Sequence, residues 1–234
     1  MASADNSIAH KIKKLLALAD GNKNENERAS AMRLAMELLA KHNLDMAQVG
    51  DAGEDIDIVE FDAHMKLEPW IRRILHAACA LYYTRLIMRP VYRGAFGDRK
   101  EWHPTFVGSE ENIDCTMEVA TWLIGSVRAE SNALFSHAFE RRSFRVGAAD
   151  KILQRAMDLI VEEKQVAGAT PGNSLMVLRN ELESANQKYM DKKNLGTFQS
   201  RGGYHDRAAY GQGQEFGSNV NLGKTKKTKA ITMQ

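Results

Sequence analysis

Hydrophobic residues recur at three- and four-residue steps through the first 45 residues of the chain, a spacing that places them on one face of a helix. A polar segment at residues 20–27 separates two such stripes. Gly21 favours the end of the first helix, and residues 24–27 resemble a capping box that begins the second. The pattern predicts a helical hairpin module at residues 1–49. Its stripes consist of Ile8, Ile12, Leu15, Leu16 and Ala19, and of Ala31, Ala35, Leu38 and Leu39.

Three motifs follow one another in this hairpin: KIKKLLALA at residues 11–19, NENE at 24–27, and an Ala-Met to His-Asn-Leu-Asp run at 31–45. Their order resembles the N-terminal module of an uncharacterised family found in tailed phages, prophages and many bacteria. Looser motifs at 105–108, 143–147 and around Tyr210 to Gly217 resemble the module that often follows it. The resemblance implies a phage or prophage setting and no particular activity.

After the hairpin, the chain divides by composition into three further regions. Residues 50–65 are acidic and contain spaced apolar positions, which predicts a linker that feeds a short strand. Residues 66–222 carry most of the apolar side chains and are expected to form the main domain. Residues 223–234 form a basic tail.

The main domain alternates between helical and strand patterns. An apolar stripe from Trp70 to Leu81 predicts a helix that begins after Pro69. Residues 85–92 and 101–107 read as two strands around a turn, and therefore as a β-hairpin. Two long helices follow, the first capped by Ser109 and running to about Phe139, the second beginning at Ser143 and ending near Gly168. Shorter helices are expected at 175–190 and 207–220. This order predicts a mainly helical α+β domain.

Small residues recur every four positions in the last of these helices, at Ala209, Gly213 and Gly217. On a helix they share one line and allow another backbone to approach closely. Because glycine lowers helix propensity, we expect tight packing against a neighbouring helix or a second subunit to compensate. The spacing matches neither a P-loop nor a dinucleotide fingerprint.

Composition points to an ordinary soluble protein. The 234 residues carry a formal net charge of +2, and the sequence contains no 18-residue apolar run and no signal peptide. We therefore expect a cytoplasmic protein, in the host cell if it is phage-encoded, with no membrane partner. Cys79 and Cys115 lie in apolar helical contexts, which favours buried reduced thiols.

The search for catalytic chemistry finds no HExxH, CxxC, GxSxG or EF-hand pattern, and the seven histidines are scattered. His76 and Cys79 are spaced three apart and could share a helix face, but one His and one Cys make half a metal site. Core packing is the favoured interpretation for both. We assign no catalytic residue, no metal ligand and no cofactor, and a non-enzymatic role is favoured over an enzyme.

Basic residues gather in three places, and aromatic residues are interleaved with the first group. Solubilising charge is the structural interpretation of each cluster, and protection of an edge strand is a further structural interpretation of the first. The functional interpretation is phosphate neutralisation with base stacking on nucleic acid. The clusters are Arg85, Arg89, Arg93, Arg99, Lys100 and Trp102; Arg141, Arg142 and Arg145; and Lys224, Lys226, Lys227 and Lys229. The interleaved aromatics also include Tyr82, Tyr83, Tyr92 and Phe96.

Three hypotheses follow from the sequence. The first is a phage or prophage accessory protein that binds nucleic acid through the basic β-hairpin and tail, in recombination, replication or host takeover. The alternative is a homo-oligomeric assembly or anti-defence factor that binds a host or phage protein through the helix containing Ala209, Gly213 and Gly217. The second alternative is a metal-dependent hydrolase. We favour the first because three separate clusters agree in the sign of their charge.

Overall fold

The computed structural model describes residues 59–62, 67–93, 99–168, 174–193, 205–220 and 222, together with five separate positions near the N-terminus. In these residues, five helices accompany one three-stranded antiparallel sheet, which confirms the predicted α+β class with a helical majority. The elements are β1 (Val59–Asp62), α3 (Pro69–Leu81), β2 (Arg85–Arg93), β3 (Arg99–Gly108), α4 (Glu110–Leu134), α5 (Ala138–Gly168), α6 (Ser174–Lys192) and α7 (Arg207–Asn219).

The five separate positions all belong to the predicted N-terminal hairpin. Each of them is helical, and Leu15 packs against the main hydrophobic core. The rest of the predicted hairpin, most of the acidic linker and the basic tail lie outside the described residues. The five positions are Lys11, Lys14, Leu15, Leu34 and Leu38.

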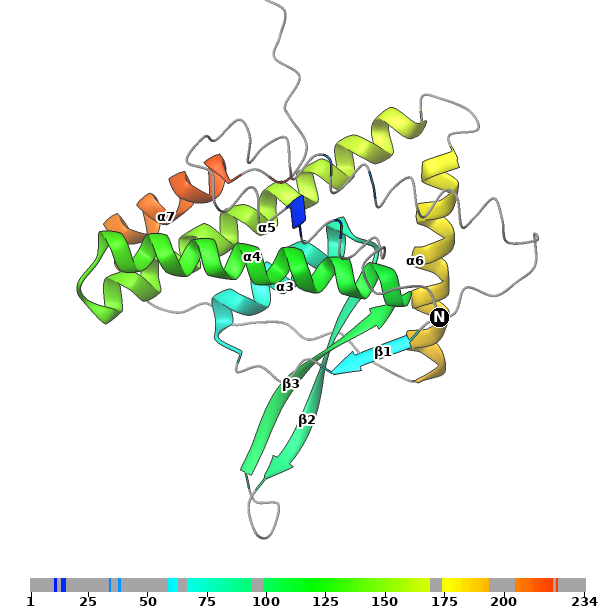
Figure 1. Ribbon diagram of the computed structural model, residues 1–234, viewed down its shortest axis with the longest axis horizontal. Coiled ribbons are helices and arrows are strands. Elements are labelled where there is room, and N and C mark those ends of the chain that lie inside the picture. The colour runs from blue at the N-terminus through cyan, green and yellow to red at the C-terminus, as the bar shows by residue number, and fades with distance from the viewer. Residues whose placement is uncertain are drawn as a thin grey trace, which may run out of the picture.

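The sheet has the strand order β1–β3–β2, and both pairs are antiparallel. All nine residues of β2 pair with β3, as the predicted β-hairpin requires. β1 pairs with the opposite edge of β3 only from Thr105 to Gly108. The inner part of the hairpin is therefore a three-stranded sheet, and its outer part extends away from the helices as a strand pair (Figure 1).

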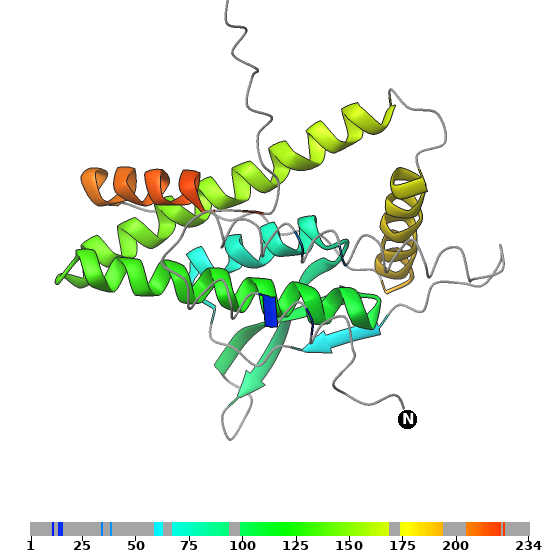
Figure 2. The same ribbon diagram turned by 45° about the horizontal axis from the view of Figure 1, so that its top comes forward.

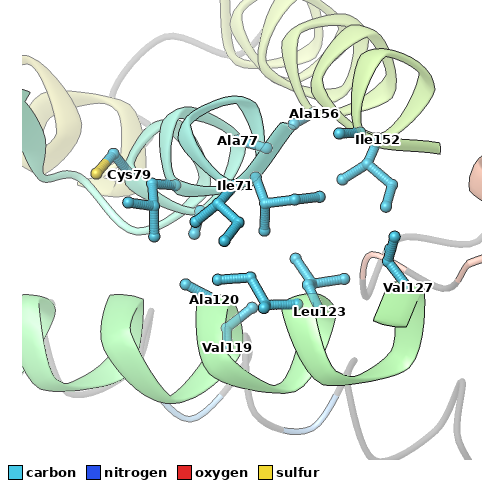
Figure 3. Close-up of a cluster of buried hydrophobic side chains, with 14 of the residues drawn as sticks. Ile71, Ala77, Cys79, Val119, Ala120, Leu123, Val127, Ile152 and Ala156 are labelled. Atoms are coloured by element: carbon cyan, nitrogen blue, oxygen red, sulfur yellow. The ribbon is translucent and has the colours of Figure 1, made fainter. Parts of the chain in front are cut away.

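The hydrophobic core lies where α3, α4 and α5 meet. Ile71 of α3, Leu123 of α4 and Ile152 of α5 face one another (Figure 3), and none is more than 2% exposed. The spacing that predicted α3 from the sequence also determines which of its faces enters this core. Burying side chains of this size contributes about 1.5–3 kcal/mol each, so the three helices form one stable support for the sheet.

A tight turn connects α3 to β2. Tyr83 adopts a left-handed backbone conformation with φ 58°, which is uncommon for a residue other than glycine. The Thr84 amide donates to the Cys79 carbonyl at 3.1 Å, and the Asn186 side chain of α6 donates to the Tyr83 carbonyl at 2.9 Å. These bonds fix the direction in which β2 leaves the helical core.

The break between α4 and α5 comes earlier than the sequence pattern predicts. We expected the first helix to reach Phe139 and the second to begin at Ser143, but the interruption lies at residues 135–137. Phe135 is extended, with φ −128° and ψ 134°, and its ring centroid lies 5.7 Å from that of Phe144. This aromatic contact joins two helices and has no signature in local periodicity, so the predicted boundary was wrong.

The helix α7 lies alongside α5 (Figure 2), and its small residues form the contact. Ala209, Gly213 and Gly217 are all buried there. A Cβ atom at Gly213 would overlap the backbone carbonyl of Phe144 on α5, and one at Gly147 of α5 would overlap the backbone of α7. The close helix packing predicted from the small residues is confirmed, and the neighbour is a helix of the same chain.

Candidate nucleic-acid interface

The outer part of the β-hairpin, residues 88–93 of β2 and 99–104 of β3, is here called the β-arm. Among the described residues, no third strand pairs with it, because β1 reaches along β3 only as far as Thr105. Residues 88–104, which include the connecting loop, contain four Arg or Lys and two Asp or Glu, a net charge of +2. The β-arm is therefore a projecting strand pair with an excess of positive charge.

One face of the β-arm exposes two aromatic side chains. The register pairs Pro90 with Trp102 and Tyr92 with Lys100, and alternate residues of a strand share a face. Tyr92 is 60% exposed and Trp102 is 46% exposed. Large exposed aromatic surfaces on neighbouring strands offer a platform on which nucleic-acid bases can stack.

At the outer end of the β-arm, the register places Arg93 directly opposite Arg99. Like charges at directly opposed positions of a strand pair are unfavourable unless an anion lies near them. Lys100 follows in β3 and lies opposite Tyr92. Because successive residues of a strand alternate between faces, Lys100 shares the face of the exposed aromatic pair, whereas Arg93 and Arg99 occupy the opposite face of the same strand pair.

Arg85 and Arg89 share a face of β2 as predicted, but that face is not a free basic surface. Ile87 lies between them and is only 5% exposed. Arg89 forms an ion pair with Glu60 of β1, and the same carboxylate accepts the hydroxyl of Tyr189 on α6 at 2.8 Å. The charge of Arg89 is therefore neutralised within the fold, whereas Arg85 is exposed.

Two of the interleaved aromatics do not lie on the surface. Tyr82 is 1% exposed and Tyr83 is 9% exposed, because both belong to the turn that joins the core to β2. Their expected place among exposed stacking groups was wrong. Phe96 lies outside the described residues.

The second basic cluster occupies the first turns of α5 and not the turn before it, as a consequence of the early break. Arg142 is exposed, and Arg141 is partly buried. Arg145 donates to the Ser131 hydroxyl at 2.8 Å and to the Asn132 side-chain oxygen at 2.9 Å. This guanidinium is thus held in place by neutral groups.

The remaining predicted surfaces lie elsewhere. Ala209, Gly213 and Gly217 are buried against α5, so a second subunit could reach them only by displacing that helix. The basic tail lies outside the described residues; its lysines are Lys224, Lys226, Lys227 and Lys229.

The His, Cys, Asp and Glu side chains form no candidate metal site in the part of the chain that the structure describes. No group of three His, Cys, Asp or Glu there could hold a metal ion. Both cysteines are free and buried, and burial raises the pKa of Cys79 and of Cys115 to about 12. His76 is exposed, so its predicted packing in the core was wrong.

The described helices include none that is long and apolar enough to span a membrane.

Residues 7–46 match the model of a family described as a protein of unknown function, DUF2786. The segment coincides with the predicted N-terminal hairpin and confirms, over that length, the resemblance to an uncharacterised family. No curated protein and no solved structure matches the chain significantly. The β-arm lies outside the matched segment.

The link between Arg89, Glu60 and Tyr189 was not found from the sequence. Glu60 and Tyr189 are 129 positions apart, and Glu60 and Arg89 are 29 apart. The acidic, alternating pattern of residues 50–64 predicted a strand but not which arginine it would neutralise. Only the register of β1 on β3 brings these side chains together.

Proposed function

We propose that the protein binds nucleic acid through the β-arm. The observation that carries the proposal is that Tyr92 and Trp102 are exposed on one face of the β-arm, which also carries the Lys100 position, while Arg93 lies opposite Arg99 on the other face at the outer end. Arginine supplies the phosphate contacts that give most of the affinity, and the aromatic rings supply sequence-tolerant stacking. Arg85 adds an exposed positive charge nearer the base of the same hairpin.

The aromatic pair favours nucleic acid with unpaired bases. A two-stranded ribbon can enter the major groove of a duplex, but the bases of a duplex are already stacked on one another. In a single strand each base has a free face, and stacking on an aromatic side chain contributes about 1–3 kcal/mol per base. We therefore expect single strands to bind more tightly than duplexes of the same length.

The resemblance of residues 11–45 to a family common in phages and prophages supports a biological setting for this activity. In that setting the protein acts in the cytoplasm of the bacterial host, in recombination, replication or host takeover. The basic tail, which follows α7 in the sequence, adds further positive charge to the same chain.

Fluorescence anisotropy with labelled single-stranded and duplex oligonucleotides tests the proposal. The double variant Tyr92→Ala/Trp102→Ala should bind single strands about thirtyfold more weakly or worse, because two stacking contacts of at least about 1 kcal/mol each are removed. The double variant Arg93→Ala/Arg99→Ala should bind more weakly and lower the salt dependence by about 0.7 per lost phosphate contact on a single strand.

Matched control variants distinguish a loss of affinity caused by the β-arm from a general effect of removing charge or an aromatic side chain. Lys188→Ala/Arg207→Ala removes two exposed positive charges from α6 and α7, and Phe139→Ala removes an aromatic ring that is 44% exposed. Neither should change the affinity appreciably. If the two β-arm variants bind as tightly as the wild type, or if the controls lose as much affinity as they do, the β-arm is not the binding surface.

A further inference from the structure

Two guanidinium groups lie against one buried tryptophan, away from the β-arm. Trp70 is at the beginning of α3 and is only 1% exposed. The guanidinium carbon of Arg128 on α4 lies 5.6 Å from the centroid of its ring, and that of Arg145 on α5 lies 5.7 Å from it. Three helices therefore bring two positive charges to one aromatic ring, in the range of cation–π contacts.

Arg145 is held in place without being neutralised. Its Nε donates to Ser131 and one terminal nitrogen donates to Asn132, and both acceptors are neutral side chains of α4. Arg73 and Arg89 differ from it, because each forms an ion pair with a carboxylate. The arrangement orients the Arg145 guanidinium and leaves its charge available.

A third arginine, Arg141, lies one helical turn before Arg145 on α5 and therefore on the same face of that helix. Burial lowers the pKa of Arg145, the Glu68 carboxylate raises it, and Arg128 and Arg141 lower it further. Glu68 accepts the indole N–H of Trp70 at 3.0 Å and lies 3.9 Å from a terminal nitrogen of Arg128. Among the charged groups that act on the Arg145 pKa, Arg128 and Arg141 are positive and Glu68 is the single carboxylate, so positive charge exceeds negative charge around Arg145.

We propose that Arg128, Arg141 and Arg145 form a binding site for a phosphate group, and that the Trp70 ring supports the guanidinium groups of Arg128 and Arg145 from below. The planar guanidinium presents paired donors that match two oxygens of a phosphate, and a dianionic phosphate offsets the unbalanced charge of the cluster. Arg128 has a side chain that is 49% exposed, so a ligand can reach the site from solvent. This site does not depend on the function proposed for the β-arm.

The phosphate can belong to a free ligand or to a nucleic-acid backbone, and NMR can separate the two. The protein has three tryptophans, Trp70, Trp102 and Trp122, so its ¹⁵N spectrum contains three indole N–H signals. The Trp70→Phe variant identifies the Trp70 signal. The two probes are inorganic pyrophosphate and a ten-residue oligothymidylate without terminal phosphates. Each is titrated into the protein, and a separate titration with sodium chloride to the same ionic strength is the control.

We expect pyrophosphate to shift the Trp70 signal in a saturable way and to leave the Trp122 signal in place. If the oligothymidylate shifts Trp70 as well, the site also accepts backbone phosphate; if it does not, the site is specific for free phosphates. A shift of Trp102 alone reports binding at the β-arm. Failure of the phosphate site and failure of the β-arm are therefore distinguishable.

Variants connect the signal to the arginines. Arg145→Gln keeps a hydrogen-bond donor near the position of Nε, which donates to Ser131, and removes the charge, so pyrophosphate should bind about tenfold more weakly. Arg128→Gln should have a similar effect, and Arg207→Gln, which changes an exposed arginine of α7, should have none. An unchanged Trp122 signal confirms that each variant is folded.

Three results would overturn the proposal. The first is a Trp70 signal that neither probe shifts. The second is an equal shift with sodium chloride alone, which would indicate ionic strength and not binding. The third is unchanged pyrophosphate affinity in a folded Arg128→Gln/Arg145→Gln double variant.

Discussion

Gly213 of α7 lies so close to the backbone carbonyl of Phe144 on α5 that a Cβ atom at this glycine would overlap the oxygen. Backbone cannot move aside as the end of a flexible side chain can. Gly213→Ala should therefore lower the free energy of unfolding by about 1–3 kcal/mol, the usual cost of overpacking. Chemical denaturation followed by circular dichroism measures the change.

Gly211 provides a matched control on the same helix. It is exposed, and a Cβ atom there would meet nothing within 4 Å. Gly211→Ala should raise the free energy of unfolding by about 0.5–1 kcal/mol through helix propensity alone. If both substitutions stabilise the protein, α7 does not pack on α5 at this distance.

The Tyr189 hydroxyl bonds to Glu60 at 2.8 Å and so ties α6 to the sheet. Tyr189→Phe should lower the free energy of unfolding by about 0.5–1.5 kcal/mol, because it leaves the ring and removes the hydrogen bond. In a Glu60→Ala background the same substitution should have no effect, and a double-mutant cycle measures the coupling. Additive effects of the two substitutions would contradict the contact.

The buried thiols make stability depend on pH in the alkaline range. Burial raises the pKa of Cys79 and of Cys115 to about 12 in the folded protein, against about 8.5 for an unfolded cysteine. The unfolded chain therefore loses these protons first as the pH rises. The stabilisation is fully present below about pH 8.5 and is lost progressively between there and about pH 12.

Each thiol should thus reduce the free energy of unfolding by up to about 1.4 kcal/mol per pH unit above about pH 8.5. Urea unfolding at neutral and alkaline pH tests this, with Cys79→Ala/Cys115→Ala as the comparison. The double variant should show a shallower decline. Equal slopes for the two proteins would mean that the thiols ionise as readily in the folded state as in the unfolded chain.

The Tyr82 hydroxyl is buried and has no hydrogen-bond partner among the described residues. Removing an unsatisfied buried polar group relieves its desolvation cost, so Tyr82→Phe should raise the free energy of unfolding by about 1 kcal/mol. Tyr210→Phe is the control, because the Tyr210 hydroxyl donates to Asp150 at 3.0 Å and its loss should be destabilising. Thermal unfolding of the two variants should move in opposite directions.

Local sequence patterns were sufficient to predict an element wherever its type and position depend mainly on its own residues. The apolar stripe from Trp70 to Leu81 predicted α3, and the small residues Ala209, Gly213 and Gly217 predicted a closely packed helix. The paired strand patterns likewise predicted the hairpin that contains the β-arm. In each case the spacing of the apolar or small side chains along the sequence matches the period of the helix or strand that they form.

Other features depend on residues that meet only after folding. The early end of α4 accompanies the contact between Phe135 and Phe144, and the burial of Tyr82 follows from the turn into β2. The phosphate site proposed here has the same origin, since Trp70, Arg128 and Arg145 come from three helices. No spacing in the chain marks these residues as a group.

The sequence by itself therefore determined which segments are helix or strand, and where basic residues accumulate along the chain. Periodicity and charge are local properties, so they can be read without the fold. Tertiary structure decided which of those charges remain available: Glu60 neutralises Arg89, whereas Ser131 and Asn132 orient Arg145 without neutralising it. The reason is physical, because a charge acts through its neighbours in space, and only folding selects them.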